Sequence, residues 1–599
     1  MQLSDFAAAP NLVRLFLDRA VERGDRPFLA AKREGEWRTQ SWREAAQQVC
    51  VLAEALRALG LSDGDRVVLV AENRPEWAIA DLAIMAAGCI TTPAYTTNTE
   101  GDHLHILENS GAKAAIVSTQ KLAEPLLPAV IRSGVAAHVI GMEPLRPVQA
   151  SFARHLWSDL LEGDATAARR AVEARMAAVG RRDPACIIYT SGTSGAPRGV
   201  LLHHGAILCN VEGAAHVLAG DFGWGDERFL SFLPLSHALE HTAGLYLPIG
   251  LGAEVWYAEG LDKLASNMEE ASPTFMVVVP RLFEVLRNRI ITQVEKQGRV
   301  ARFLLDQALA LSERRAVGQS RLSDWAIERM LDVTLRPKVR ARFGGRIKAL
   351  VSGGAPLNPE VGAFFESMGL VMLQGYGQTE SAPVISCNHP SAGIKLDTVG
   401  PPLQGVEVKI AEDGEILARG ELVMLGYWRN DEETARTIID GWLHTGDIGH
   451  LDDKGRIVIT DRKKDIIVND KGDNIAPQKL EGMLTLQREI SQAMVSGDKR
   501  PYVVGLIVPD ADWACEWAQA NDEKFDLAAL QALPAFRSVM RAAIDRVNGE
   551  LSVIEKVRQF AFAEEPFSIE NGEMTPSMKI RRHQIRARYG ERMDALYRG

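Results

Sequence analysis

Tyr189-Thr-Ser-Gly-Thr-Ser-Gly-Ala-Pro-Arg-Gly-Val200 is a run of hydroxyl-bearing residues and glycines that directly follows the apolar residues 185–188. This order is typical of a strand that leads into a phosphate-binding loop. Glycines let the backbone approach an anion closely, and the threonine and serine hydroxyls add hydrogen-bond donors. A plain flexible loop has the same composition, so this segment alone leaves both interpretations open.

Two common nucleotide-binding motifs are absent from the sequence. A Walker A loop needs Gly-x-x-x-x-Gly-Lys followed by Ser or Thr, and the chain has no Gly-Lys dipeptide. A dinucleotide-binding fingerprint needs Gly-x-Gly-x-x-Gly, whereas the glycines here stand at positions 192, 195 and 199. We therefore exclude P-loop NTPases and Rossmann dehydrogenases.

Later motifs decide how the 189–200 segment is interpreted. In order, they are Gly353-Gly-Ala-Pro356, Tyr376-Gly-Gln-Thr-Glu380, Gly426-Tyr-Trp428, Thr445-Gly-Asp447, Asp461-Arg-Lys-Lys-Asp465 and Thr575-Pro-Ser-Met-Lys-Ile-Arg-Arg582. Together these segments resemble the adenylate-forming superfamily of acyl-CoA synthetases, luciferases and adenylation domains, and most closely its bacterial long-chain fatty-acid CoA ligases. The resemblance extends over residues 30–590, so it covers the whole chain. Arg198 departs from the family's usual lysine, which leaves its contact open because a guanidinium is a planar fork rather than a point charge.

The resemblance implies how ATP is held. The loop would bind the β- and γ-phosphates, Tyr376 would offer a flat face to adenine, and Asp447 and Arg462 would fix the ribose. The residues expected to bind the nucleotide are Thr190, Ser191, Gly192, Thr193, Ser194, Gly195, Arg198, Gly353, Gly354, Ala355, Tyr376, Gly377, Asp447 and Arg462.

Charge explains why the reaction needs cations and donors. A carboxylate that attacks the α-phosphorus of ATP brings two anions together, and the transition state gathers negative charge on oxygen. The resemblance implies that Lys579 is the catalytic lysine and that Thr379 donates to the α-phosphate. It also implies that Glu380 is the Mg²⁺ ligand and that His237 orients the substrate carboxylate.

A second half-reaction is implied, in which the CoA thiol attacks the activated carbonyl and AMP leaves. A small C-terminal domain would rotate between the two steps. Lys464 matches the hinge position, and Gly472 lies on the segment that would line the thiol tunnel. The co-substrates expected are therefore ATP with Mg²⁺ and coenzyme A.

His237-Ala-Leu-Glu-His241 also matches the His-x-x-Glu-His pattern of some zinc hydrolases. Five-residue patterns arise easily by chance. We favour the interpretation in which His237 begins a helix at the acyl pocket, while Glu240 and His241 support it.

Length and apolar patterning predict an α/β protein of several domains. A chain of 599 residues exceeds what one hydrophobic core organises. Short apolar runs predict buried parallel strands, and helical spacing between them predicts a large N-terminal domain with doubly wound sheets. The predicted strands are 66–70, 114–117, 185–188, 275–279 and 347–351, and the predicted helices are 52–59 and 77–87.

From residue 406 the pattern becomes β-rich. Asp413-Gly414 between alternating apolar residues predicts a hairpin over 406–417. The charged residues 461–465 have the composition of a solvated turn, but the resemblance implies an interdomain hinge there. We therefore expect an N-terminal adenylation domain over 1–460 with a β-rich subdomain, a hinge over 461–465, and a small mobile α+β domain over 466–599 that carries the lysine.

Residues 282–343 have a strongly helical pattern with many arginines. An ordinary surface insertion and the helical insertion of long-chain acyl-CoA synthetases fit this pattern equally well, and the resemblance favours a fatty acid as the substrate. Chain-length preference depends on pocket depth, which the sequence does not give.

Net charge and cysteine usage bound the partners and the compartment. A net charge of −10 argues against a nucleic-acid partner. The six scattered cysteines predict small buried residues in a reducing compartment. Residues 1–10 lack the basic segment of a signal peptide, and the most apolar window, 77–90, is too short to span a bilayer. We expect a cytoplasmic protein, and peripheral contact with the inner face of the membrane stays open because long-chain acids partition into bilayers.

The predicted function is ATP-dependent ligation of a long-chain fatty acid to CoA. The alternatives are a fatty acyl-AMP ligase that delivers the acyl group to a carrier protein, and a medium-chain or aryl-CoA ligase. A luciferase-like oxidase and a non-catalytic binding protein fit less well. No heptad or symmetric pattern fixes the oligomeric state, which leaves a homodimer among the alternatives.

Overall fold

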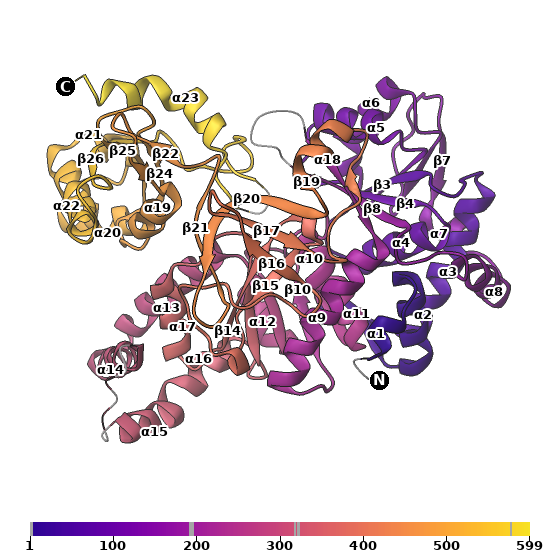
Figure 1. The fold of residues 1–599 in the computed structure, drawn as a ribbon, viewed down its shortest axis with the longest axis horizontal. Coiled ribbons are helices and arrows are strands. Elements are labelled where there is room, and N and C mark those ends of the chain that lie inside the picture. Colours follow the sequence, from indigo (N-terminus) through magenta and orange to yellow (C-terminus); the bar gives the residue numbers. More distant parts are fainter. Residues whose placement is uncertain are drawn as a thin grey trace.

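The computed structural model of the protein describes residues 4–190, 197–316, 319, 321, 324–575 and 578–598. Ser191, Gly192, Thr193, Ser194 and Gly195 of the predicted phosphate loop therefore lie outside the described residues. Figure 1 shows two large sheets surrounded by helices, a β-rich part beside them, and a smaller C-terminal domain. This arrangement confirms the predicted fold class.

The first large sheet is doubly wound. Val67 and Leu69 of β3 point into a core shared with α3 and α4, whereas Val68 and Val70 point into a second core shared with α5 and α6. Alternation along one strand thus buries both faces of the sheet, as expected for parallel strands between two helical layers. The strands, in spatial order, are β18 (Gly426–Tyr427), β9 (Arg198–His203), β8 (Pro184–Thr190), β4 (Ile90–Pro93), β3 (Arg66–Val70), β5 (Ala114–Val117), β6 (His138–Gly141) and β7 (Ala153–Leu156). The helices are α2 (Leu12–Arg23), α3 (Trp42–Ala58), α4 (Pro75–Ala86), α5 (Glu100–Ser110), α6 (Gln120–Ser133) and α8 (Ala165–Met176).

The second large sheet has the same number of strands, and the helical insertion packs on it. Its core combines strand residues such as Met276 and Leu350 with Phe283 and Leu305 of the insertion. The strands, in spatial order, are β15 (Val384–Cys387), β14 (Met372–Gly377), β13 (Ala349–Ser352), β12 (Phe275–Val278), β10 (Arg228–Ser231), β11 (Glu254–Tyr257), β1 (Pro27–Arg33) and β2 (Glu36–Ser41). The helices are α12 (Leu264–Ala271), α13 (Pro280–Lys296), α14 (Arg299–Ala316), α15 (Asp324–Thr334), α16 (Arg336–Arg342) and α17 (Pro359–Ser367).

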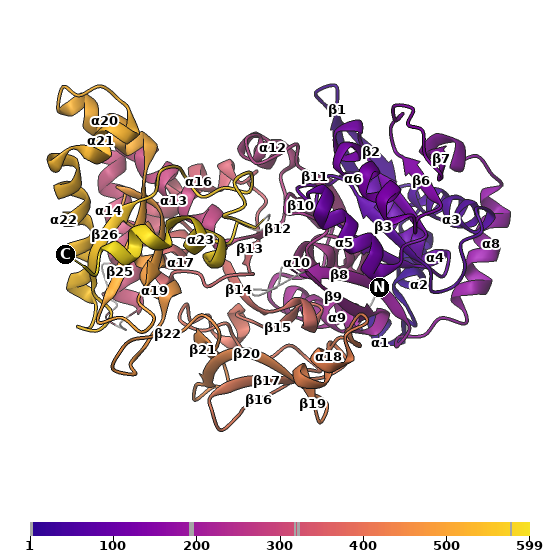
Figure 2. The same cartoon turned by 90° about the horizontal axis from the view of Figure 1, so that it is seen from above.

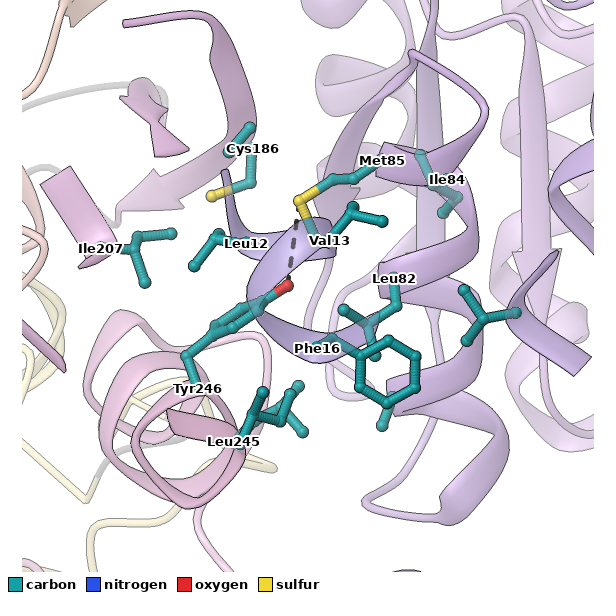
Figure 3. Close-up of a cluster of buried hydrophobic side chains, with 14 of the residues drawn as sticks. Leu12, Val13, Phe16, Leu82, Ile84, Met85, Cys186, Ile207, Leu245 and Tyr246 are labelled. Atoms are coloured by element: carbon teal, nitrogen blue, oxygen red, sulfur yellow. Dashed lines mark hydrogen bonds between the residues drawn. The ribbon is translucent and has the colours of Figure 1, made fainter. Parts of the chain in front are cut away.

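Three helices meet in the core close-up of Figure 3. Leu12 and Phe16 of α2, Leu82 of α4 and Leu245 lie there with at most 2% of their surface exposed. Leu245 belongs to the π-helix η1 (His241–Tyr246), whose Tyr246 hydroxyl points at the Met85 sulfur, 3.8 Å away. The other α-helices described between residues 4 and 251 are α1 (Ser4–Ala8), α7 (Trp157–Leu160), α9 (His204–Phe222), α10 (Ala238–Glu240) and α11 (Leu247–Leu251).

The β-rich part confirms the predicted hairpin. Strands β16 and β17 pair antiparallel, and Gly414 between them has φ +84°, a value that favours glycine in a tight turn. The strands, in spatial order, are β16 (Glu407–Ile410), β17 (Glu415–Arg419), β20 (Trp442–Leu451) and β19 (Ile438–Ile439), with β21 (Ile457–Arg462) also paired to β20. The short helices here are η2 (Thr379–Ser381), η3 (Pro390–Ala392) and α18 (Asp431–Thr437).

The C-terminal domain has two cores of its own, one on each face of a three-stranded sheet. Ile507 of β25 contributes to one core and Leu506 to the other. Figure 1 and Figure 2 both show this domain at the end of the molecule opposite the first large sheet. The strands are β22 (Ile467–Val468), β23 (Asn474–Ile475), β24 (Ile490–Ser496), β25 (Val503–Pro509) and β26 (Val557–Phe562), and the helices are α19 (Pro477–Thr485), α20 (Ala511–Ala520), α21 (Leu527–Ala532), α22 (Pro534–Glu550) and α23 (Arg582–Ala595). Within the described part of the chain, no helix combines the length and the hydropathy needed to cross a bilayer.

Candidate active site

A cleft of about 2480 Å³ brings most of the predicted site residues together. Its walls come from both large sheets, from the β-rich part and from the C-terminal domain. The predicted residues that line it are Thr190, Arg198, His237, Gly353, Gly354, Ala355, Tyr376, Gly377, Thr379, Glu380, Asp447, Arg462, Lys464 and Lys579. Gly472 does not line the cleft; it occupies a turn between β22 and β23 with φ +87°.

The carboxyl ends of β13 and β14 supply one wall of the cleft, as expected for open α/β sheets. Glycines are needed there because the backbone is crowded. A Cβ on Gly353 would lie 3.1 Å from the Leu239 side chain, and a Cβ on Gly377 would lie 1.8 Å from the Pro383 carbonyl oxygen. Gly354 has φ +83°, which a side chain would disfavour. These glycines bring bare backbone to the edge of the cleft.

Asp447 links the second sheet to the β-rich part. Its Oδ2 accepts a hydrogen bond from the Tyr376 hydroxyl at 2.8 Å, and its Oδ1 lies 3.1 Å from Arg462 Nε. Burial raises the pKa of Asp447, while Arg462 and Tyr376 oppose the shift. Burial also raises the pKa of Tyr376, so its hydroxyl stays a donor. The three side chains form a polar corner in which a carboxylate faces the cleft.

Glu380 and Arg198 are joined through an aromatic side chain that the sequence analysis gave no role. The Tyr427 hydroxyl donates to Glu380 Oε1 at 2.7 Å, and the Arg198 guanidinium stacks over the Tyr427 ring at 4.6 Å. Arg198 also forms an ion pair with Glu433. Tyr427 belongs to the Gly426-Tyr-Trp428 motif, so a signal for it existed. Glu433 stands in no motif, and the pairing of Arg198 was not foreseen.

His237 begins α10, as expected. Its Nδ1 accepts a hydrogen bond from the Leu239 backbone N–H at 3.2 Å, so the ring proton of the neutral imidazole sits on Nε2. Burial, and then the charge of Lys579, lower the pKa of His237 to about 3. His237 is therefore a neutral side chain with one N–H available to an acceptor in the cleft.

His241 and Glu240 take different partners from His237. His241 Nε2 contacts Asp81 Oδ2 at 2.9 Å, and the Tyr246 hydroxyl donates to the same oxygen at 2.5 Å. Burial raises the pKa of Glu240 to about 8. Because the histidines of the His-x-x-Glu-His pattern are held separately, one by a backbone amide and one by Asp81, the zinc interpretation has no geometric support. Within the described residues, no three metal-ligating side chains cluster.

Lys579 reaches the cleft from the C-terminal domain. Its side chain lies against Gly354, where an added Cβ would be 4.0 Å from Lys579 Cε. Desolvation, and then the charge of Arg462, lower the pKa of Lys579 to about 8, while Asp447 and Asp465 oppose the shift. The side chain is nevertheless exposed to the space of the cleft, where water partly offsets the desolvation.

The charged segment 461–465 is anchored at its centre. Lys463 Nζ lies 2.6 Å from Asp413 Oδ2 and 2.9 Å from Glu415 Oε2. Arg462 is held by Asp447, and both Arg462 and Lys464 line the cleft. Arg462 and Lys463, on the N-terminal side of Lys464, are therefore fixed to the β-rich part.

One part of the cleft is apolar. Its apolar residues come from the helical segments α9, α10, η1 and α11 and from strands β10, β12 and β13 of the second sheet. The transfer of hydrocarbon surface from water to such a wall is favourable. The apolar lining residues are Ala214, Val217, Leu218, Phe229, Leu239, Ala243, Leu247, Val277 and Val351.

Sequence comparisons match nearly the whole chain. Residues 16–428 match the family described as AMP-binding enzyme, and residues 464–599 match the AMP-binding enzyme C-terminal domain. A long-chain-fatty-acid–CoA ligase of Mycobacterium bovis is 34% identical over 96% of this chain and 95% of its own length. Long chain acyl-CoA synthetase 7, peroxisomal, of Arabidopsis thaliana is 30% identical over 94% of this chain and 82% of its own length.

Solved structures share the fold at lower identity. The adenylation domain of a carboxylate reductase from Mycobacterium chelonae superposes with a TM-score of 0.78 at 21% identity, covering 100% of this chain and 93% of that one. An anthranilate CoA ligase in complex with anthranoyl-AMP superposes with a TM-score of 0.69 at 20% identity, covering 98% of this chain and 99% of that one.

Proposed function

We propose, because this chain belongs to the AMP-binding enzyme family, that it joins a long-chain fatty acid to CoA at the expense of ATP. In the first half-reaction the acid carboxylate attacks the α-phosphorus of ATP, which gives acyl-AMP and pyrophosphate. In the second, the CoA thiol attacks the acyl carbonyl and AMP leaves. The names of the relatives, which are long-chain ligases and synthetases, support this substrate class.

One observation carries the proposal: a single cleft combines the polar corner around Asp447, the carboxylate of Glu380, the amine of Lys579 and an apolar wall. A nucleotide needs the polar groups, and an acyl chain needs the apolar wall. His237 lines the same cleft as the polar groups and the apolar wall. Its Nε2–H is therefore available to the substrate carboxylate. A polar nucleotide and an apolar acid can therefore meet in one space.

We assign the nucleotide contacts by the chemistry of each group. Asp447 is an acceptor suited to ribose hydroxyls, and its links to Tyr376 and Arg462 hold it in place. The Tyr376 ring and the backbone of Gly353 and Gly354 are the proposed adenine site. The phosphates are assigned to the 190–198 loop, with Arg198 supporting Glu380 through Tyr427 instead of acting only as a free cation.

The reacting centre is assigned to Lys579 and Thr379. Both line the cleft and can donate to oxygens of the α-phosphate as negative charge grows there. His237, as a neutral donor, orients the carboxylate without adding a second cation next to Lys579. Donors held in place before the reaction contribute most to such a transition state.

Glu380 fits Mg²⁺, which takes one or two protein carboxylates and completes its shell with phosphate oxygens and water. The Tyr427 hydroxyl donates to Glu380 Oε1, and no other side chain in the described part of the protein donates to Glu380 Oε2. When bound, Mg²⁺ would screen the charge of the phosphates.

For the second half-reaction we propose that residues 466–599 turn about a hinge at 461–465 against the adenylation domain, residues 1–460. Lys464 is the proposed pivot. Gly472, which lies away from the present cleft, would then approach the thiol path. The ion pairs of Lys463 with Asp413 and Glu415 support Lys464 as the pivot, because they fix the chain on the N-terminal side of that residue.

We also propose a cytoplasmic location, since all six cysteines are free thiols. Contact with the inner face of the membrane is proposed only as transient, for the uptake of the acid. Co-sedimentation with vesicles checks the membrane contact, and light scattering of the purified enzyme distinguishes a monomer from a homodimer.

The experiment that tests the function follows each product. The enzyme is incubated with oleate, Mg²⁺ and α-labelled ATP without CoA, and then chased with CoA. We expect labelled acyl-AMP before the chase, and AMP with oleoyl-CoA after it. Acyl-AMP that survives the CoA chase would favour delivery to a carrier protein, and the absence of any acyl-AMP would contradict the proposal.

A further inference from the structure

Met578 has a backbone conformation that is unusual for its side chain. Its φ is +62°, in the left-handed region that favours glycine. Described residues on both sides hold it: Met578 N–H donates to the Thr575 carbonyl at 2.8 Å, and Met574 pairs with Ile580. A residue other than glycine keeps such a strained conformation only where contacts with the surrounding structure hold it in place.

The side chain of Met578 joins two hydrophobic cores. On one side it packs against the core of the C-terminal domain that contains Met574. On the other side it packs against an apolar cluster of the N-terminal domain that includes Leu239 and Val279. Leu239 also lines the acyl part of the cleft. A residue of the C-terminal domain therefore forms part of the wall of the proposed acyl site.

A cavity of about 30 Å³ marks the place. Met578 and Leu239 line it together with His237 and Lys579. His237 and Lys579 mark the reacting end of the substrate, so the cavity lies beside the carboxylate and not at the far end of the acyl chain. Met578 packs against the Leu239 cluster at this cavity, so its side chain occupies space beside the carboxylate that a branch on the chain would need.

We propose that Met578 is a specificity-determining residue that limits the width of the acid next to its carboxylate. The inference rests on the proposed function. Because Met578 directly precedes Lys579, the same placement of the C-terminal domain that brings the lysine to the phosphate also brings the methionine against the acyl chain. Adenylation is thereby coupled to a straight, unbranched substrate.

The test compares hexadecanoate with 2-methylhexadecanoate in pyrophosphate exchange, using wild type, Met578→Ala, Met578→Gly and Met578→Leu. We expect wild type to prefer the straight acid. Met578→Ala should raise the branched-to-straight ratio of kcat/KM by about tenfold, the usual effect of one methyl group in an apolar pocket. Met578→Gly should raise the ratio as much, since it opens the same space and suits φ +62°, and Met578→Leu should stay near wild type.

The ratio is internal to each variant, so partial loss of folded enzyme cancels. Thioester formation from preformed 2-methylhexadecanoyl-AMP should be the same in all four proteins. An equal fall for both acids in Met578→Ala, with an unchanged ratio, would mean that the side chain only docks the domain and would overturn the inference. Wild type that activates neither acid would overturn the proposed function as well, whereas normal activity on the straight acid with unchanged ratios overturns this inference alone.

Discussion

Lys579 and His237 line the same cleft, and they differ in charge: one is a cation and the other is a neutral imidazole. The lysine is the cation, and its charge helps to keep the imidazole neutral. A cation paired with a neutral donor suits a site where an anionic acid must approach anionic ATP. A protonated His237 would hold the carboxylate as an ion pair and so oppose its attack.

Replacing Lys579 by alanine removes the donor to the α-phosphate. We expect adenylation, measured as pyrophosphate exchange, to fall by ~10² to 10³, the usual cost of losing one such donor. Thioester formation from preformed acyl-AMP serves as the control, and it should fall far less. Equal losses in the two half-reactions would contradict the role.

The pH dependence follows from the lowered pKa of Lys579, about 8. The protonated form is active, so kcat/KM for ATP in adenylation should be retained below this pKa and fall as pH rises through it. With a pKa of about 3, His237 adds no acidic limb near neutrality. Lys579→Arg, which stays charged, should lose the alkaline limb at a lower overall rate; an unchanged limb would assign it to another group.

Single residues were predictable where they stand in motifs and not where they act through distant partners. Glu380, Asp447 and Lys579 were named from sequence and line one cleft. Asp81 was missed because its partner His241 is 160 residues away, and only the folded sheet order brings them together. The loop residues 191–195 lie outside the described residues, so their predicted role stays a prediction.

At the scale of elements, the apolar runs predicted the strands well. The runs 66–70 and 114–117 are β3 and β5, and the ends of the other three predicted strands moved by up to two residues. The π-helical turn η1 was not predictable, because its extra residue per turn depends on tertiary contacts such as the Tyr246–Asp81 hydrogen bond.

Two buried tyrosines test what holds this turn. Tyr246→Phe removes a hydrogen bond to the Asp81 carboxylate and should lower the free energy of unfolding by about 1–3 kcal/mol. Tyr257→Phe is the matched control, since its buried hydroxyl has no hydrogen-bond partner within the described residues. It should be neutral or stabilising in the same thermal denaturation assay. Equal destabilisation by both variants would contradict this account of η1.

The proposed hinge element is tested by Lys464→Pro. Proline fixes φ and should restrict rotation of the C-terminal domain, so thioester formation should fall more than adenylation. Some loss of adenylation is also expected, because Lys464 lies within the turn closed by the Asp465 N–H and the Arg462 carbonyl. Lys464→Ala, which leaves φ free, is the control. Wild-type thioester formation by Lys464→Pro would refute the hinge assignment.

At the scale of the whole molecule, contacts between α13, the second sheet and the C-terminal domain help to hold that domain in position. Arg281 at the start of α13 donates to the Ser491 carbonyl of β24 and pairs with Glu284 at 2.6 Å. Leu486 packs against the core of the second sheet. The sequence predicted that two parts of the chain exist, but not this docking, because Arg281 and Ser491 lie 210 residues apart in the chain.

Arg281→Ala should weaken the docking that presents Lys579. Loss of one such hydrogen bond costs about 0.5–1.5 kcal/mol, so adenylation should fall about two- to tenfold while thioester formation from acyl-AMP is spared. Arg488→Ala, which removes an exposed ion pair with Glu516 inside the C-terminal domain, is the control and should leave both steps unchanged. A matching loss in Arg488→Ala would show that the effect is not one of docking.

The central claim is that one cleft activates a long-chain acid and passes it to CoA. The most direct measurement is AMP release against carboxylic acids from acetate to oleate, with and without CoA, with the thioester detected directly. We predict CoA-dependent turnover that peaks at long chains, since His237 and many apolar side chains line the same cleft. A peak at acetate or at an aromatic acid, or pyrophosphate exchange without any thioester, would contradict the account.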